Sequence, residues 1–437
     1  MNMFLKNMVI SGYRLEDNHV PQICRDVLVS VHGQCNGKKN TVRMSREILA
    51  MHSVLIGATG SGKTNLLKQI LPQLISNLYS SDVMLVFDSK MDFVDLHREK
   101  DLVVSNCHKG NEWNIFMDVV SDGWDITSIE ENADEIAELL FADAISNSNQ
   151  PFFPRAARDI FSAIVQAMCR IGANNKKYRV EWMNNMVLKR YISQIDAVKL
   201  KEFLKEYPDL SGVLKYVGNG CSDQSLGVFA ELQSVVNNIF VGSFNQNGRL
   251  SIRHLVKERQ ARVLYVEYDP SNGASIKPTY QTLVDLFLKE ALSTRNIRRG
   301  NVYVICDELK MLPRLHYFED ALNFGRSLGI SVICGIQSMQ QLYETYGEFG
   351  GKNIAAGFQS VFCFCTHDEE TRNYIQSLYG KNMCLMQYST PSGNIKEERV
   401  AGYCIEEWDM VSLKRGEAII GLPFEKPFRF LFDRYGG

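Results

Sequence analysis

The sequence has no apolar run close to the roughly 20 residues that a membrane-spanning helix needs. Its first residues, MNMFLKNMVISGYRLEDNHV, are too interrupted by polar positions for a secretory signal peptide. Internal repeats and low-complexity linkers are also missing. We therefore expect a cytoplasmic globular chain without a transmembrane segment.

A basic excess is missing too, since 48 Lys and Arg residues nearly balance 50 Asp and Glu residues, for a formal charge of −2. A protein that coats nucleic acid is usually basic overall. Composition therefore excludes a protein whose whole surface binds nucleic acid. Any contact with nucleic acid has to be through a local basic patch or a pore.

Spacings typical of zinc sites do not occur. The eleven cysteines include no C-x-x-C pair, and the eight histidines include no H-E-x-x-H. An odd, unpaired set of cysteines in a chain of 437 residues indicates reduced thiols in a reducing compartment. We interpret these cysteines as small buried apolar residues and predict no zinc site.

Short apolar runs separated by helical patterns dominate most of the chain. Continuous runs of this kind are typical of strands buried on both faces of a parallel sheet, and the alternation with helices is typical of an α/β fold. We therefore expect an α/β fold with a mostly parallel central sheet. The predicted strands are residues 26–32, 53–56, 83–87, 263–266, 302–306, 330–334 and 361–365.

One stretch interrupts this alternation, because the periodicity from about Asp125 to Val241 is almost entirely helical. We expect an all-helical domain inserted into the α/β core. Its predicted helices are residues 129–141, 154–170, 182–191, 197–207 and 224–240. The expected domains are residues 1–124, the first part of the nucleotide-binding core, 125–245, the insertion, and 246–437, the second part of the core.

The strongest motif is a complete G-x-x-x-x-G-K-[ST] sequence between the apolar run SVLI and the helical pattern NLLKQILPQLI. In such a loop, glycines let successive backbone N–H groups point at phosphates beside a helix N-terminus. We expect Lys63 to neutralise β- and γ-phosphate charge and Thr64 to ligate Mg²⁺, so ATP and Mg²⁺ are the predicted cofactors. The predicted nucleotide-binding residues are Gly57, Ala58, Thr59, Gly60, Ser61, Gly62, Lys63, Thr64 and Asn65.

The run NVYVIC ends in two carboxylates, Asp307 and Glu308. A carboxylate at the tip of such a strand can hold Mg²⁺ through its water shell, and its neighbour can act as the general base for the attacking water. We assign these roles to Asp307 and Glu308 respectively.

Two further polar residues are candidates for the same site. Gln337 follows the run ISVICGI, at a strand's carboxyl end, where ligands gather in such sheets. We expect it to sense the γ-phosphate. Arg326 precedes the same run and is a candidate arginine finger for a neighbouring subunit. His52, just before the P-loop strand, either faces the nucleotide base or packs in the core, and we favour packing.

Several segments together carry a family resemblance. They are LVFDSKMDF, EWNIF, PFFPRAARDIF, CDELKMLPRLHYFEDALNFGRSLGISVICGIQSMQQLYETYG and THDEETRNYIQSLYG, with the tail ERVAGYCIEEWDMVSLKRGEAIIGLPFEKPFRFLFDRY. In this order they resemble the type IV coupling proteins of bacterial conjugation and type IV secretion, the TraD/TraG-like family, which is related to the FtsK/HerA hexameric DNA pumps. The resemblance runs from about residue 51 to residue 435.

The resemblance implies a RecA-like ATPase with a helical insertion that assembles as a hexameric ring. It also implies delivery of a relaxase–DNA complex, or of protein substrates, to a type IV secretion channel, and a peripheral position at the inner face of the membrane. The family's trans-acting arginine corresponds to Arg326 and its γ-phosphate glutamine to Gln337. Asp88 and Lys90 match the family's D-x-K element, and Arg372 is a second candidate cation at a subunit interface.

Three functions remain open at this level. The first is a coupling-protein motor that recruits and pumps conjugative DNA through a ring pore, without reading its sequence. The second is a HerA/FtsK-like translocase in repair, mobile-element maintenance or defence. The third is a nucleotide-controlled platform that docks protein cargo. Candidate DNA-contacting cations, each equally interpretable as a solvated surface charge, are Arg155, Arg158, Lys176, Lys177, Arg179, Arg295, Arg298 and Arg299.

Overall fold

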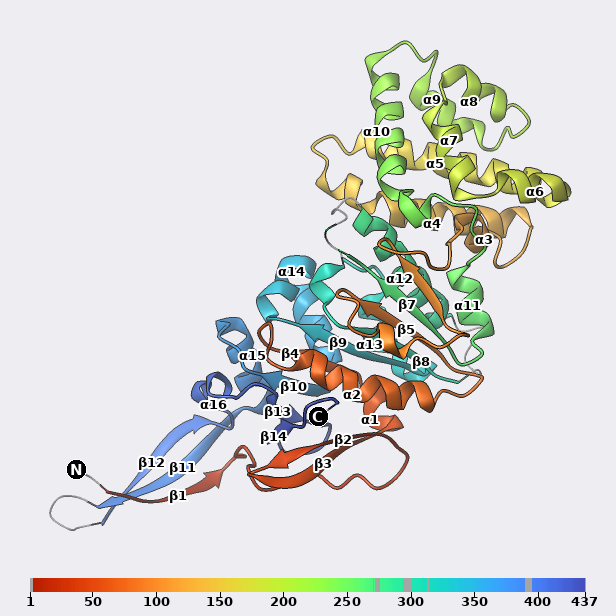
Figure 1. Cartoon of the computed structure of the whole chain (residues 1–437). Helices are drawn as coiled ribbons and strands as arrows, with labels where there is room; N and C mark the ends of the chain where they lie inside the picture. The colour runs from red at the N-terminus through yellow and green to blue at the C-terminus, as the bar shows by residue number, and fades with distance from the viewer. Residues whose placement is uncertain are drawn as a thin grey trace.

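The computed structural model describes residues 3–269, 271, 276–293, 300–312, 314–389 and 395–436. Figure 1 shows three regions in this part of the chain. A central sheet is flanked by helices, a mostly helical region lies above it, and a narrow arm of strands extends away from it near the N-terminus.

The centre of the described part of the chain is an eleven-stranded sheet with the order β3-β2-β14-β13-β10-β4-β9-β8-β5-β7-β6. The strands from β10 to β6 in this order are parallel, and β13, β14, β2 and β3 extend the sheet antiparallel beyond β10. The expected mostly parallel α/β fold is therefore confirmed. The strands are β2 (Val27–Cys35), β3 (Lys38–Ser45), β4 (Ser53–Ile56), β5 (Val83–Asp88), β6 (Leu102–Ser105), β7 (Arg262–Glu267), β8 (Val302–Cys306), β9 (Ile330–Ile336), β10 (Ser360–Phe364), β13 (Glu417–Gly421) and β14 (Phe428–Phe432).

The two faces of this sheet are covered by different helices. Successive residues of a strand point to opposite faces. Met84 and Val86 belong to the buried cluster that contains the apolar side of α2, whereas Leu85 and Phe87 belong to the cluster that contains α12, α13 and α14. The helices around the sheet are α1 (Arg46–Ala50), α2 (Lys63–Ser76), α11 (Ile252–Glu258), α12 (Lys277–Leu292), α13 (Phe318–Phe324), α14 (Met339–Gly357), α15 (Glu369–Tyr379) and α16 (Glu407–Val411).

Helices gather between β6 and β7 in the chain, as the periodicity predicts. The long helix α5 is the centre of this region, with apolar side chains buried along its length against α4 and α10. The helices are α3 (Ile115–Val119), α4 (Ile126–Asn147), α5 (Phe152–Asn174), α6 (Lys176–Trp182), α7 (Asn185–Ser193), α8 (Ala197–Phe203), α9 (Leu214–Val217) and α10 (Asp223–Ile239).

The prediction of one helix over residues 182–191 is wrong. Helix α6 ends at Trp182, and α7 begins three residues later at Asn185. The side chain of Asn184 accepts a hydrogen bond from the backbone N–H of Val187 at 3.0 Å and so caps α7. Asn184, inside an apparently helical pattern, therefore marks the start of a new helix.

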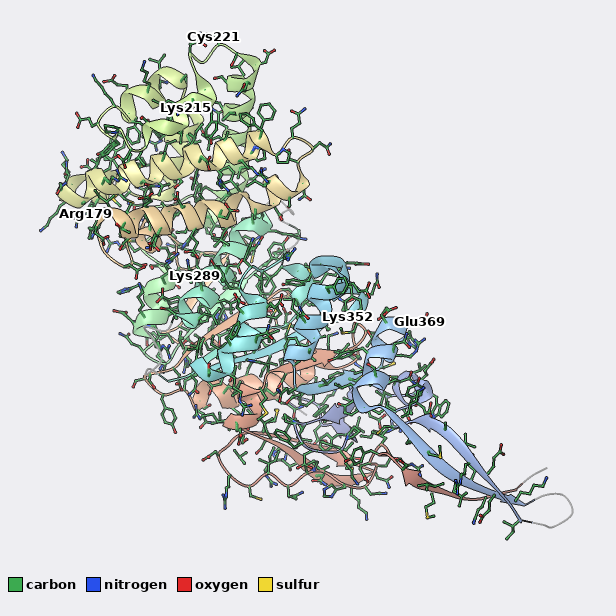
Figure 2. The ribbon with its side chains drawn as sticks, turned by 180° about the vertical axis from the view of Figure 1, so that it is seen from behind. Arg179, Lys215, Cys221, Lys289, Lys352 and Glu369 are labelled. Atoms are coloured by element: carbon green, nitrogen blue, oxygen red, sulfur yellow. The ribbon has the colours of Figure 1, made fainter. Side chains whose placement is uncertain are left out.

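A charged network joins the helical region to the sheet region. Glu135 of α4 is paired with Arg253 of α11 and with Lys289 of α12, whose Nζ lies 2.5 Å from the carboxylate. The Tyr317 hydroxyl, just before α13, donates to the same carboxylate at 3.0 Å. Figure 2 shows Lys289 at this junction. Glu135 and Arg253 are buried in this network and Lys289 is partly exposed, so paired charges connect the helical region to α11 and α12.

The arm is a separate three-stranded antiparallel sheet in the order β1-β11-β12. It combines the first strand, β1 (Met3–Ser11), with β11 (Lys381–Ser389) and β12 (Ile395–Tyr403), which are far away in the sequence. Most of the described side chains of β12 are exposed, so no buried apolar run marks it. The sequence did not predict this arm for that reason.

Candidate active site

The loop of residues 57–64 joins β4 to α2 at the carboxyl edge of the parallel strands. Gly62 has φ of +128°, and a Cβ added to it would lie 2.9 Å from the Cα of Gly416. Gly57 likewise has φ of +156°, with the Cβ of Phe364 in its way. Only glycine suits these backbone angles and close approaches, which is why the motif requires it there.

The amine of Lys63 is buried inside this loop. Its Nζ donates to the carbonyl oxygen of Gly57 and, at 3.4 Å, to that of Ala58. Burial lowers the pKa of Lys63, while the nearby carboxylate of Glu308 raises it. The residue is thus a cation held by uncharged carbonyl groups, ready to exchange them for an anionic ligand.

Asp307 follows β8 and is 6% exposed. Its carboxylate accepts hydrogen bonds from the backbone N–H and the hydroxyl of Ser89, at 3.1 and 2.9 Å. Burial and then the charge of Asp88 raise the pKa of Asp307 to about 7, against the opposing effect of the two hydrogen bonds. A buried carboxylate in this condition is stabilised as an anion when a cation lies beside it.

Asp88 organises the loop that follows β5. Its carboxylate accepts from the backbone N–H groups of Lys90, Asp92 and Phe93 at 3.2, 3.0 and 2.9 Å. These bonds fold the loop so that Lys90 lines the same cavity as Asp307. The D-x-K element therefore contributes one residue that shapes the loop and one that faces the cavity.

Glu308 is held by one oxygen only. Its Oε2 accepts a hydrogen bond from Nε2 of Gln337, following β9, at 2.8 Å. Its buried Oε1 has no hydrogen-bond partner among the described residues. A carboxylate that is 5% exposed, with one oriented and one unused oxygen, is suited to accept a proton from a bound water.

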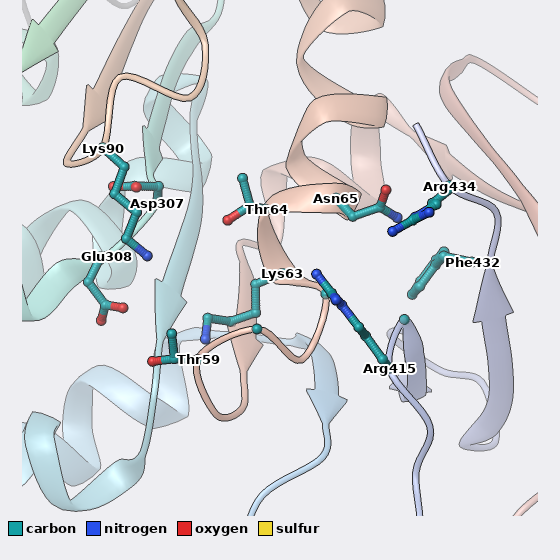
Figure 3. A pocket seen from close by; sticks show the side chains of 13 residues that line it. Thr59, Lys63, Thr64, Asn65, Lys90, Asp307, Glu308, Arg415, Phe432 and Arg434 are labelled. Carbon is teal, nitrogen blue, oxygen red and sulfur yellow. The ribbon is translucent and has the colours of Figure 1, made fainter. Parts of the chain in front are cut away.

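These elements surround a cavity of about 560 Å³. Figure 3 shows two groups of side chains on either side of Lys63 and Thr64. Lys90, Asp307 and Glu308 form one group, and Asn65, Arg415, Phe432 and Arg434 form the other. The lining residues are Thr59, Gly60, Gly62, Lys63, Thr64, Asn65, Lys90, Asp307, Glu308, Arg415, Gly416, Phe432 and Arg434.

The structure brings most of the predicted site residues together. Gly57, Ala58 and Ser61 complete the loop without lining the cavity, and Gln337 reaches it through Glu308. Sequence reasoning missed Arg415, Phe432 and Arg434. They reach the cavity because β13 and β14 pair beside β10, and no local motif indicates that pairing.

Arg326 does not line the cavity of its own chain. It lies in a short 3-10 helix (Gly325–Leu328) before β9, whereas Gln337 lies after β9. The Arg326 side chain is half exposed and lies 3.6 Å from the carboxylate of Glu47. Since β9 has seven residues, its two ends are about 20 Å apart.

Two other candidates have partners away from the cavity. His52, just before β4, is 2% exposed, and its Nδ1 accepts a hydrogen bond from the backbone N–H of Val332 at 3.1 Å. It packs in the core. Arg372 of α15 lies 3.3 Å from Glu407 and donates to the carbonyl of His367 at 2.6 Å.

The candidate DNA-contacting cations differ in their surroundings. Arg158 is paired with Glu138 and Asp159, and Arg179 stacks over the ring of Trp124 at 3.9 Å while it caps the end of α5. Lys177 is highly exposed, and its Nζ lies 3.9 Å from the carboxylate of Glu181. The candidates Arg295, Arg298 and Arg299 lie outside the described residues.

Comparison with known proteins identifies the family. Residues 38–403 match the family described as the type IV secretion-system coupling protein DNA-binding domain. This chain belongs to that family. It is 21% identical over 377 residues to the coupling protein TraD of Escherichia coli strain K12, a match that covers 81% of this chain and 48% of TraD. The chain thus spans about half the length of that relative.

Solved coupling-protein structures share the fold. The bacterial conjugative coupling protein TrwBdeltaN70, in its unbound monoclinic form, matches with a TM-score of 0.72 at 18% identity, over 99% of this chain and 93% of that one. The plasmid coupling protein TrwB in complex with ADP and Mg²⁺ matches with a TM-score of 0.71, at 18% identity over 99% and 95% of the two chains.

No helix in the part of the chain that the structure describes is both long and apolar enough to span a bilayer. Across the same residues, no group of three or more His, Cys, Asp or Glu side chains is arranged to hold a metal ion.

Proposed function

We propose that this chain is a coupling-protein ATPase that binds ATP with Mg²⁺ and uses hydrolysis to move DNA, carried by a relaxase, into a type IV secretion channel. The observation that supports this most strongly is the convergence of three segments on one cavity, in a chain of the coupling-protein family: Lys63 from the loop, Asp307 and Glu308 from the end of β8, and Gln337 through its hydrogen bond to Glu308.

The residues of the loop and of β8 fit a magnesium nucleotide. Backbone N–H groups of residues 57–64 bind the phosphates, and Lys63 gives up its carbonyl partners to neutralise them. The Thr64 hydroxyl and Asp307 are the residues that hold Mg²⁺, with Asp307 placed by Ser89. When bound, Mg²⁺ supplies positive charge that offsets charge on the phosphates.

Glu308 is the proposed general base. Its hydrogen bond from Gln337 fixes the carboxylate, and the unused Oε1 accepts a proton from the attacking water. Gln337 joins the γ-phosphate end of the cavity to β9 through this bond. A change in the ligand that moves the Glu308 carboxylate would therefore also move Gln337 at the end of β9.

Arg326 serves the neighbouring subunit in this proposal. Because it lies at the opposite end of β9 from Gln337, it is too far away to act on the nucleotide of its own chain. In a closed ring of six subunits, the same arginine offsets transition-state charge at the nucleotide of the neighbouring subunit.

The helical region, residues 125–245 in the proposed domain division, is the proposed contact for DNA or secreted protein. The exposed Lys177 is one candidate there, and its contact with phosphates would not depend on sequence. The chain functions on the cytoplasmic side of the membrane, where its partners hold it.

The test is the ATPase rate of the chain at low salt, without DNA and with single- or double-stranded DNA. Marked stimulation by DNA, lost in Glu308→Gln, supports the DNA motor. A rate that DNA does not change contradicts it, and directs the search to protein cargo on the helical region. Relaxase binding, measured separately, distinguishes a secretion role from other DNA transport.

A further inference from the structure

Two arginines of the C-terminal segment line the active-site cavity without a partner. Arg415 lies in the turn before β13, and Arg434 lies two residues after the end of β14. Both are exposed, and no described residue gives either guanidinium group a hydrogen bond or an ion pair. Charged groups that face a cavity without a partner are suited to a ligand.

The position of Arg434 is fixed by its neighbours. The carbonyl oxygen of Asp433 accepts from Nδ2 of Asn65 at 2.9 Å and from Nε2 of Gln69 at 2.8 Å. On the other side, the backbone N–H of Tyr435 donates to Oδ1 of Asn65 at 2.8 Å. Because the residues before and after it are both bonded to α2, Arg434 is held beside the start of that helix.

Arg415 is held against the P-loop in the same way. The next residue, Gly416, donates its backbone N–H to the carbonyl of Ser61 at 2.8 Å and accepts from Phe432 at 2.9 Å. The Phe432 ring packs on Phe364, with centroids 6.0 Å apart, and so fixes this wall of the cavity. These contacts fix the backbone beside Arg415, and a binding group on a fixed backbone lowers the entropic cost of binding.

The two arginines lie across Lys63 and Thr64 from the carboxylates of Asp307 and Glu308 (Figure 3). The carboxylates mark the γ-phosphate end of the cavity, so the arginines are at the end where base and ribose extend. A guanidinium group stacks on aromatic faces and offers several N–H donors. We propose that Arg415 and Arg434 bind the nucleoside part of the nucleotide, an inference that rests on the proposed ATPase function.

The test compares ligands with and without a nucleoside. MgATP, MgADP and magnesium tripolyphosphate are titrated calorimetrically into the wild type, Arg415→Ala and Arg434→Ala. Each substitution is expected to raise the Kd of ATP and of ADP about 10-fold, because it removes a charged donor or a stacking partner. The Kd of tripolyphosphate should change less than about twofold, since Lys63 and the loop remain.

Lys414→Ala is the matched control, because Lys414 is the cation next to Arg415 yet lines a different cavity. It should leave all three Kd values unchanged. Arg415→Lys keeps the charge and loses the planar group, so it should behave like Arg415→Ala.

Three results overturn the inference. They are an unchanged Kd of ATP in both alanine variants, an equal rise in the Kd of ATP and of tripolyphosphate, or a wild-type Kd of ATP in Arg415→Lys. The first shows that neither arginine contacts the nucleotide, and the other two show that only charge matters. If the wild type binds neither ATP nor tripolyphosphate, the proposed ATPase function fails instead, which separates the two failures.

Discussion

The two edges of the parallel sheet use their buried polar residues differently. At the carboxyl edge, Lys63, Asp307 and Glu308 face a shared cavity, and Glu308 keeps an unused oxygen. At the amino edge, Asp82 before β5 and Asp101 before β6 are buried and bonded to backbone N–H groups of neighbouring segments.

This difference separates carboxylates that can act on a ligand from carboxylates that stabilise the fold. Asp82 and Asp101 at the amino edge hold strand ends and loops together, and the oxygens of both carboxylates accept hydrogen bonds from backbone N–H groups. At the carboxyl edge, Asp307 and Glu308 are oriented by one or two hydrogen bonds and line the cavity, whereas Asp88 accepts three backbone N–H bonds and shapes a loop. The carboxylates that line the active-site cavity therefore lie at the carboxyl edge, in agreement with the general position of ligands in open α/β sheets.

The largest effect is expected from Glu308→Gln at the carboxyl edge. The amide cannot accept the proton of the attacking water, so the ATPase rate should fall about 10³-fold. Thermal unfolding should hardly change, because Gln keeps the shape of the side chain. A steady-state phosphate-release assay measures the rate, and a variant that retains more than a tenth of it would remove Glu308 from the role of base.

Arg326→Ala tests an exception to the difference between the two edges. This residue lies at the amino edge, yet it is proposed to act on the nucleotide of a neighbouring subunit. The ATPase rate should fall about 10²-fold, with the Kd for ATP of the separated subunit unchanged. Mixing this variant with Lys63→Ala should restore part of the activity, since some interfaces then combine an intact loop with an intact arginine. No recovery in the mixture would contradict action between subunits.

Asp82→Ala tests whether buried carboxylates at the amino edge stabilise the fold. It removes the acceptor for the backbone N–H groups of Asn301, at 2.7 Å, and Tyr79, at 3.0 Å. The free energy of unfolding should fall by about 2–4 kcal/mol, because two partly buried backbone donors lose their acceptor. Denaturant unfolding measures this loss, with the exposed Asp95→Ala as control. The Kd for ATP should not change. A tenfold change would contradict the claim that Asp82 acts only in stability.

His52→Asn has the smallest expected effect, and it depends on pH. Burial lowers the pKa of His52 to about 4, so the folded state keeps this side chain neutral. Unfolding restores a pKa near 6.5, and the unfolded chain therefore binds more protons between these values. Stability present above pH 6.5 should be lost as the pH falls towards 4.

The loss attributable to His52 should be about 1–3 kcal/mol. Asn keeps an acceptor for the N–H of Val332 and does not titrate, so the variant should show a shallower decline of unfolding free energy over the same pH range. Parallel pH profiles for the two proteins would show that His52 does not titrate as described.

Sequence reasoning identified the parts of the molecule that depend on local patterns. The strands of the parallel sheet are continuous apolar runs, and the P-loop and the pair Asp307–Glu308 are short motifs at strand ends. It missed what depends on distant pairing. The arm joins β1 to a hairpin more than 300 residues away, and Arg434 reaches α2 through the pairing of β13 and β14. In neither case does a nearby residue indicate the partner.

The central claim is that the carboxyl edge binds a magnesium nucleotide, and calorimetric titration of MgATP tests it most directly. Wild type and Glu308→Gln should bind with similar Kd values, because Glu308 acts in the chemical step rather than in binding. Lys63→Ala should lose measurable binding, since its amine is the cation buried in the loop. Absence of binding by wild type and Glu308→Gln, or undiminished binding by Lys63→Ala, would contradict the account.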